Sequence, residues 1–184
     1  MLAHFDFPKT LQASAYLLKK ANAPMKYLKL LKLLYLADRE MLLNHGLVIT
    51  CDNYCAMKHG PVPSHTYDII MGRDPVNCPV WNHFIQPTGN KCVELIIDPG
   101  IEELSEADTD YLDAVFNKYG SWDVWRVRDF THTLPEWINR PEEKNTSSVP
   151  FTPIDILREN GCEDVIPAYQ EHIDIARELD LLFG

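Results

Sequence analysis

Residues 29–46 read KLLKLLYLADREMLLNHG, and this stretch decides the fold more than any other part of the chain. Its apolar residues recur at the spacing of a helix, and Gly46 follows as a stop signal. We therefore predict a helix over residues 25–44. One face of this helix is apolar and is formed by Tyr27, Leu28, Leu31, Leu34, Tyr35, Met41 and Leu42.

The same helix carries polar residues in two different settings. Lys26, Lys29 and Lys32 lie on a polar side with Arg39 nearby, which indicates a solvated face or, alternatively, a binding surface for an acidic partner. Asp38 instead falls in the middle of the apolar face. Because a buried carboxylate is costly unless it is hydrogen-bonded or paired, we expect Asp38 to have a dedicated partner. That partner is either a cluster of backbone donors or a nearby cation.

Outward from this helix, periodicity and turn residues define the remaining elements. Further helices are predicted at residues 8–20, 64–71, 105–119, 122–132, 153–160 and 167–182. Strands are predicted at 47–50, 54–58, 80–86 and 91–97, with a rigid turn at 59–63 and a polar loop at 140–150. The last helix has a broad apolar arc, which predicts packing against the body along Tyr169, Ile173, Ala176, Leu179 and Phe183. The fold class is thus mostly α (α+β), a single domain over residues 1–184 with about seven helices and a small antiparallel sheet or hairpin.

Charge is distributed unevenly along the 184 residues, whose net charge is −10. Residues 1–50 carry seven Lys/Arg against three Asp/Glu, giving +4, and the remainder carries ten against twenty-four, giving −14. An acidic chain is a poor direct binder of nucleic acid and a plausible partner for a basic protein, although the charge also aids solubility. We expect a cytoplasmic protein without a membrane span, because no long apolar run and no signal peptide is evident.

The chemistry-bearing residues do not form a recognisable catalytic motif. The five cysteines are an odd number without a secretory signal, which indicates reduced, mostly packed thiols. His45, Cys51, Cys55, His59 and His65 are spaced too widely along a strand to share one zinc ion. A Cys–His pair such as Cys55 with His59 or His132, or one that uses Cys162, is the remaining enzymatic alternative. We therefore predict a non-enzyme with no cofactor and no metal.

An aromatic run comprises Trp122, Trp125, Phe130 and Trp137. Two tryptophans three residues apart on a short helix are usually buried, so we interpret the run as core packing. A base-stacking platform, with Arg126 and Arg128 beside it, is the alternative.

Three segments together resemble the Panacea domain of SocA-like antitoxins. They are residues 29–46, residues 54–70 (YCAMKHGPVPSHTYDII) and residues 104–137 (LSEADTDYLDAVFNKYGSWDVWRVRDFTHTLPEW). The resemblance covers about residues 7–137, with the helices at 152–183 packed on that domain. The positions shared with the family are Lys32, Leu33, Tyr35, Ala56, Gly60, Pro61, Val62, Pro63 and His132. His59 departs from it, since the family often has an aromatic residue there.

The resemblance implies an antitoxin that neutralises a cognate toxin by direct protein–protein binding, and the acidic composition favours a basic toxin. It also implies two alternatives: a proteolytic adaptor that presents the toxin to a protease, or an inhibitor of another host or phage protein encoded by a prophage or mobile element. No enzymatic activity is implied. No appended DNA-binding segment is evident in these residues, so we do not expect this chain alone to regulate its own operon.

A partner-binding site is predicted on these positions and on nearby tyrosines. The stiff turn at residues 60–63 would lose little entropy on docking, and exposed tyrosines are good anchors. The alternative is that the turn only orients two elements and the tyrosines are core. The predicted site residues are Lys32, Tyr35, Asp38, Tyr54, His59, Gly60, Pro61, Val62, Pro63, Tyr67 and His132.

Overall fold

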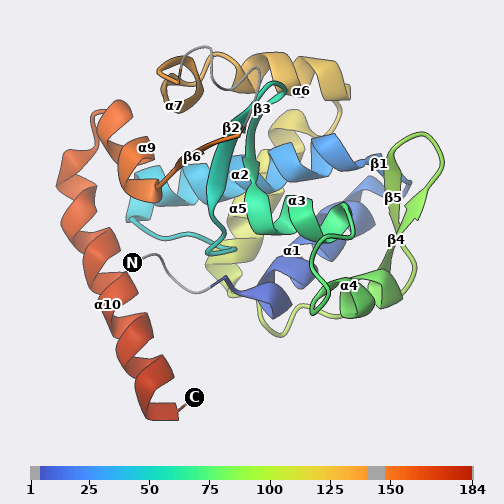
Figure 1. The fold of residues 1–184 in the computed structure, drawn as a ribbon, viewed down its shortest axis with the longest axis horizontal. Coiled ribbons are helices and arrows are strands. Elements are labelled where there is room, and N and C mark those ends of the chain that lie inside the picture. Colours follow the sequence, from blue (N-terminus) through green and yellow to red (C-terminus); the bar gives the residue numbers. More distant parts are fainter. Residues whose placement is uncertain (1–4, 141–147, 184) are drawn as a thin grey trace.

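The computed structural model describes residues 5–140 and 148–183 and has a mostly helical α+β architecture, as predicted. Nine α-helices and one short 3-10 helix fall within those residues (Figure 1). The helices are α1 (Phe7–Ala21), α2 (Tyr27–His45), α3 (Ser64–Ile70), α4 (Cys78–Phe84), α5 (Glu106–Tyr119), α6 (Val124–Thr131), α7 (Pro135–Ile138), α9 (Pro153–Glu159), η1 (Glu163–Val165) and α10 (Ile166–Phe183).

Helix α2 runs through the middle of the molecule, and the other elements pack around it (Figure 1). It contacts α1, α5, α6, α9 and β3, and every residue from 30 to 39 is buried. Because the helix is covered on all sides, the predicted solvated face does not exist at Lys32, which is 0% exposed, or at Arg39, which is 8% exposed. Lys26 and Lys29 remain half-buried. The helix ends at Gly46, as predicted, with a left-handed backbone (φ 67°).

Two small antiparallel sheets flank α2. The first has the strand order β1–β5–β4, made of β1 (Met25–Lys26), β5 (Cys92–Leu95) and β4 (Ile85–Thr88). The second has the order β3–β2–β6, made of β3 (Gly60–Pro63), β2 (Tyr54–Met57) and β6 (Val149–Phe151). β3 is an edge strand of this sheet and contains Pro61 and Pro63. Proline cannot donate a hydrogen bond to a neighbouring strand, so it is tolerated at such an edge.

Several local predictions are corrected by tertiary contacts. Residues 47–50 are not a strand, because two of their amide groups donate to Asp38 instead of to a neighbouring strand. The predicted strand at 80–86 is mostly helix α4, which has a proline in its first turn. The rigid turn predicted at 59–63 is mostly strand β3, and the helix predicted from residue 122 begins at Val124, where Asp123 is the N-cap of α6. Most of the loop predicted at 140–150 lies outside the described residues.

Helix α10 packs on the body only through its first half. Tyr169 and Ile173 are 4% and 2% exposed, as predicted for its apolar arc, and Ala176 is half-buried. Leu179 is 51% exposed, so the prediction of packing along the whole helix is wrong there. The Phe183 side chain lies outside those described. No helix in the described ranges has the length and apolar character of a membrane span.

Candidate partner-binding site at the β2–β3 hairpin

The β2–β3 hairpin and α6 come together on one side of α2. Met57 pairs with Gly60, so Lys58 and His59 form a two-residue turn, and both are exposed. Gly60 follows with φ of 93°, a region that favours glycine. A Cβ at Gly60 would lie 2.7 Å from Oγ1 of Thr131 and 2.8 Å from Nζ of Lys32. The hairpin therefore lies closer to α2 and α6 than it could with any residue other than glycine at position 60.

Lys32 on α2 holds the hairpin in place through β3. Its side chain is fully buried, and its Nζ donates to the backbone carbonyl of Pro61 at 2.6 Å. Burial and the nearby positive charge of Arg128 hold the pKa of Lys32 well below its ordinary value. The predicted site residue Lys32 thus links α2 to β3 from a buried position, and solvent does not reach it.

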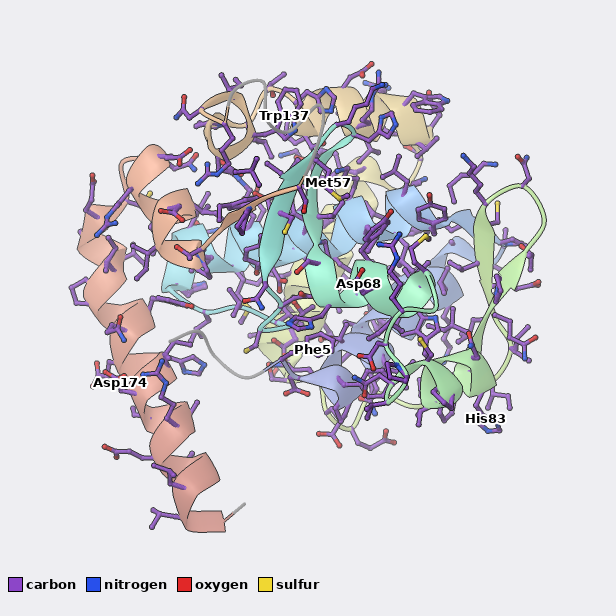
Figure 2. The ribbon with its side chains drawn as sticks, in the orientation of Figure 1. Phe5, Met57, Asp68, His83, Trp137 and Asp174 are labelled. Carbon is purple, nitrogen blue, oxygen red and sulfur yellow. The ribbon has the colours of Figure 1, made fainter. Side chains whose placement is uncertain are left out.

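His132 lies at the end of α6 and stacks on Trp137. The two ring centroids are 3.8 Å apart with an interplanar angle of 6°. The indole Nε1 of Trp137 donates to the carbonyl of Met57 at 2.9 Å, which joins the stack to β2 (Figure 2). Burial, followed by the charges of Lys32 and Arg128, lowers the pKa of His132 to about 4. The histidine is therefore neutral at physiological pH and acts as a flat packing surface.

Asp38 has the dedicated donor cluster that the sequence predicts. Its carboxylate accepts hydrogen bonds from the amides of Ile49 and Thr50 at 2.8 and 3.0 Å. It also accepts from the Thr50 hydroxyl at 2.5 Å and from the Tyr54 hydroxyl at 3.0 Å. Burial raises the pKa of Asp38 to about 6, although these hydrogen bonds oppose the rise. The partners of Asp38 are backbone and hydroxyl donors rather than a cation.

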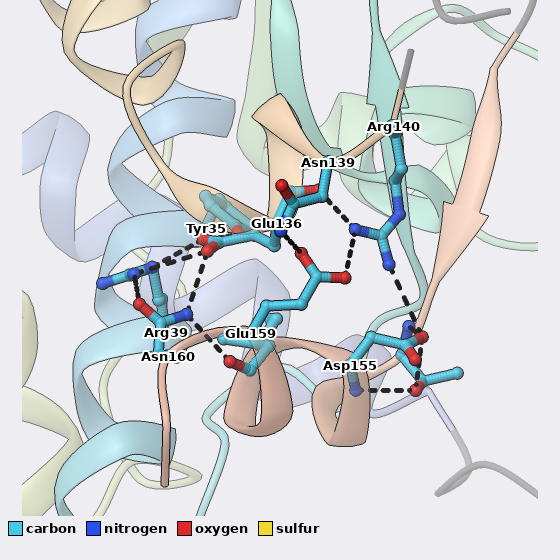
Figure 3. A network of polar contacts seen from close by, with 10 residues as sticks. Tyr35, Arg39, Glu136, Asn139, Arg140, Asp155, Glu159 and Asn160 are labelled. Carbon is cyan, nitrogen blue, oxygen red and sulfur yellow. Dashed lines mark hydrogen bonds and ion pairs between the residues drawn. The ribbon is translucent and has the colours of Figure 1, made fainter.

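Tyr35, another predicted site residue, belongs to a buried network centred on Glu136 (Figure 3). Glu136 is 0% exposed and accepts from the Tyr35 hydroxyl and from Nε of Arg39, each at 2.6 Å. Asn160 bridges the same groups, since it accepts from Nη2 of Arg39 at 2.6 Å and donates to Glu136 at 3.1 Å. The network fastens α7 and α9 to α2.

A second arginine extends this network toward the surface. Nη1 of Arg140 donates to the backbone carbonyl of Glu136 at 2.6 Å and pairs with Glu159 at 2.8 Å. The sequence did not indicate this network, because its hydrogen-bonded pairs are separated by up to 121 positions along the chain. The one signal available was an arginine directly after the buried Asp38 on a helix with many apolar residues.

The structure separates the eleven predicted site residues into buried and accessible groups. Eight of these residues are buried: Lys32, Tyr35, Asp38, Tyr54, Gly60, Pro61, Val62 and Pro63. His59 is exposed, and Tyr67 and His132 are half-buried. Tyr67 lies on α3, which follows the end of β3 opposite the turn, so it does not share the surface around His59.

The exposed surface around His59 includes a tryptophan that we predicted to be core. Trp125 is 55% exposed and meets His59 edge-on, with ring centroids 6.3 Å apart. The guanidinium of Arg128 lies over the Trp125 ring at 5.0 Å from its centroid. The core-packing interpretation is wrong for Trp125 because α6 turns its Val127 and Thr131 side inward instead. We call Lys58, His59, Trp125 and Arg128 the hairpin face.

All five cysteines are free thiols. Burial raises the pKa of Cys51 to about 12 and also raises that of Cys55. In residues 5–140 and 148–183, no group of three or more His, Cys, Asp or Glu side chains is placed to hold a metal ion.

Comparison with known proteins identifies a family. The family model described as antitoxin SocA-like, Panacea domain, matches residues 30–138. No curated protein and no solved structure matches the chain. The matched residues run from α2 to α7 and contain all eleven predicted site residues.

Proposed function

The chain belongs to the antitoxin SocA-like family with a Panacea domain, and from this premise we propose that it neutralises a cognate toxin by direct protein–protein binding at the hairpin face. The observation that carries the proposal is that the matched residues include both sides of this face, the β2–β3 turn and α6. Binding blocks the working surface of the toxin, and the chain contributes no catalytic group.

The composition of the hairpin face supports binding to a protein. Trp and Arg are the residues most enriched among those that dominate binding energy at interfaces. Trp125 offers an exposed aromatic surface, and the guanidinium of Arg128 packs over one face of its ring. Burial and then the charge of Arg128 lower the pKa of His59, so this histidine is largely neutral at pH 7 and can be desolvated at small cost. Lys58 supplies a charge at the rim.

The buried site residues support the proposal by fixing the shape of the face. Lys32 holds Pro61, and Gly60 allows the hairpin to lie against α6. A face that is ordered before binding loses little conformational entropy when a partner docks. In this proposal these residues do not touch the toxin, and their substitution weakens neutralisation through the geometry of the hairpin.

The remaining properties that we propose follow from the same family membership and from the composition. The protein acts in the cytoplasm as a single domain over residues 1–184, uses no cofactor or metal, and binds neither nucleic acid nor membrane. The net charge of −10 favours a toxin with a positive net charge, which the long-range field of the whole chain attracts, whereas Lys58 and Arg128 favour acidic groups on the part of the toxin that meets the hairpin face. Its gene lies in a two-gene module on a prophage or another mobile element.

The test is to express the protein encoded beside this gene, first alone and then with this chain, and to measure growth and co-purification. We expect the neighbour to be toxic alone, tolerated together with this chain, and recovered in a complex with it. The double variant His59→Ala with Trp125→Ala should lose protection. His83→Ala is the matched control, because His83 is also exposed and beside an aromatic ring but lies on α4, away from the hairpin (Figure 2).

Each outcome has a definite meaning. A toxic neighbour that this chain neither binds nor neutralises would refute the proposal. Protection retained by the double variant would move the binding surface away from the hairpin face. Loss of the toxin by proteolysis whenever this chain is present would indicate the adaptor mechanism rather than direct blocking.

A further inference from the structure

The second half of α10 presents an apolar stripe to solvent. Ile175, Leu179 and Leu182 are 50%, 51% and 74% exposed. Their spacing of four and then three residues places them within an arc of roughly 60° on the helix. Leu181 is 87% exposed but lies roughly 100° around the helix from Leu182, so it is not part of the stripe. Large apolar side chains gathered in this way on one element are unusual on a protein that works alone.

The stripe faces away from the rest of the protein. α10 packs through Tyr169 and Ile173, which lie roughly 120° and 160° around the helix from Ile175. The C-terminal end of α10 extends past the other elements (Figure 1). The helix is therefore held at its first half and offers its second half as a projecting arm.

The charges beside the stripe define what the arm can bind. Glu171, Asp174 and Glu178 are exposed along one flank of the stripe. Residues 166–183 carry four acidic residues against Arg177 alone, a net charge of −3. A partner segment that covers the stripe meets carboxylates along that edge, and lysine or arginine at the facing positions complements them.

The same charges argue against a second copy of this chain. A two-fold interface is self-complementary, and pairing two such helices antiparallel through this stripe sets one acidic flank against the other. Two whole chains, each with a net charge of −10, also repel each other. The arm therefore suits a partner of opposite charge.

We propose that the second half of α10 is a docking arm for a basic amphipathic helix of the toxin, whose apolar side covers Ile175, Leu179 and Leu182 and whose lysines or arginines face Glu171 and Glu178. The proposal rests on the proposed antitoxin function and adds a second contact outside the matched residues 30–138. The hairpin face and the arm act together, so the two contacts raise the affinity beyond that of either one.

The direct test uses the full chain and two synthetic peptides of the same length. One peptide carries leucines at positions a and d of a heptad with lysine elsewhere, and the other has glutamate in place of each lysine. By fluorescence anisotropy we expect the lysine peptide to bind and the glutamate peptide to bind at least about tenfold more weakly. The variant Ile175→Ser with Leu179→Ser should weaken binding of the lysine peptide by at least about tenfold.

The control variant removes two equally exposed apolar side chains elsewhere. Val80→Ser with Ile101→Ser changes residues that are 46% and 50% exposed, and it should bind the lysine peptide as the unaltered chain does. Equal binding of both peptides, or an equal loss in the control and α10 variants, would overturn the proposal. Self-association in sedimentation that the α10 variant abolishes would assign the stripe to a second copy instead.

Growth rescue separates this inference from the proposed function. If the unaltered chain protects cells from the neighbouring toxin and the α10 variant protects equally well, the arm is not a toxin contact and the inference fails alone. If the unaltered chain gives no protection, the proposed function fails, and the peptide titration still decides whether the arm binds basic helices.

Discussion

Replacing Glu136 by glutamine should destabilise the protein far more than an ordinary polar substitution. The carboxylate is 0% exposed and forms a 2.6 Å ion pair with Arg39, which is itself 8% exposed. Glutamine keeps the shape of the side chain but leaves the guanidinium buried without a counter-charge. Breaking a buried pair in this way costs about 3–5 kcal/mol. We expect a loss of that size in the free energy of unfolding at pH 7, measured by urea denaturation.

A double-variant cycle identifies the cause. Arg39→Met combined with Glu136→Gln should be less destabilised than the sum of the single variants, by about 2–3 kcal/mol. The exposed pair of Arg73 and Asp68, at 3.3 Å and with both side chains about half exposed or more, is the control, and its coupling should stay below about 1 kcal/mol.

The pH dependence gives an independent check on the same pair. Burial by itself raises the pKa of Glu136, but hydrogen bonds from Arg39 and Tyr35 and the charge of Arg39 lower it overall, below the ordinary 4.5. A depressed carboxylate pKa stabilises the fold above the unfolded value, and that contribution disappears as the pH falls through the folded value. The cost of Glu136→Gln should therefore shrink below about pH 4.5. A cost under about 1 kcal/mol at pH 7, or strict additivity of the two single variants, would refute this reasoning.

Three further predictions concern other buried groups. The pKa of Asp38 is raised to about 6 from 3.8, so its ionisation costs stability as the pH rises between these values. Relative to Asp38→Asn, the unaltered chain should lose about 2–3 kcal/mol of unfolding free energy between pH 4 and 6.5, and an unchanged difference would contradict the assignment. Gly60→Ala should destabilise the fold by more than about 1 kcal/mol, because its Cβ would lie 2.8 Å from Nζ of Lys32 at a φ of 93°. Gly89→Ala is the control, since a Cβ added at Gly89 would meet no atom within 4 Å. Equal effects of the two substitutions on the melting temperature would argue against the close approach of Gly60 to Lys32. The Cys51 thiol, with its pKa raised to about 12, should react with a disulfide reagent at pH 7.5 at least about tenfold more slowly than free cysteine.

Local signals in the sequence were sufficient to predict most of the helices and the family. The helix that ends at Gly46 and the helices predicted at 105–119 and 153–160 are all present, because caps and apolar periodicity depend on neighbours a few residues away. The prediction that Asp38 has dedicated donors is confirmed for a related reason. One carboxylate on an apolar face requires a partner wherever the chain later places it.

Tertiary structure alone decided which polar residues of α2 are buried. The sequence predicts one polar side for this helix, but residues 30–39 are covered on every side, so Lys32 and Arg39 are enclosed by β3 and by α7 with α9. The partner of Arg39 is Glu136, 97 positions away, and no periodicity can indicate such a pairing.

The exposed surfaces were also decided by tertiary structure. Trp125 and Leu179 have the apolar character and helical spacing of core residues, yet both are about half exposed. Periodicity reports that a helix has an apolar side, but whether another element covers that side depends on where the chain places the helix. The sequence by itself therefore determined most of the helices, the family and the buried carboxylate, whereas only the packing of distant elements determined which apolar and basic side chains remain free to bind a partner.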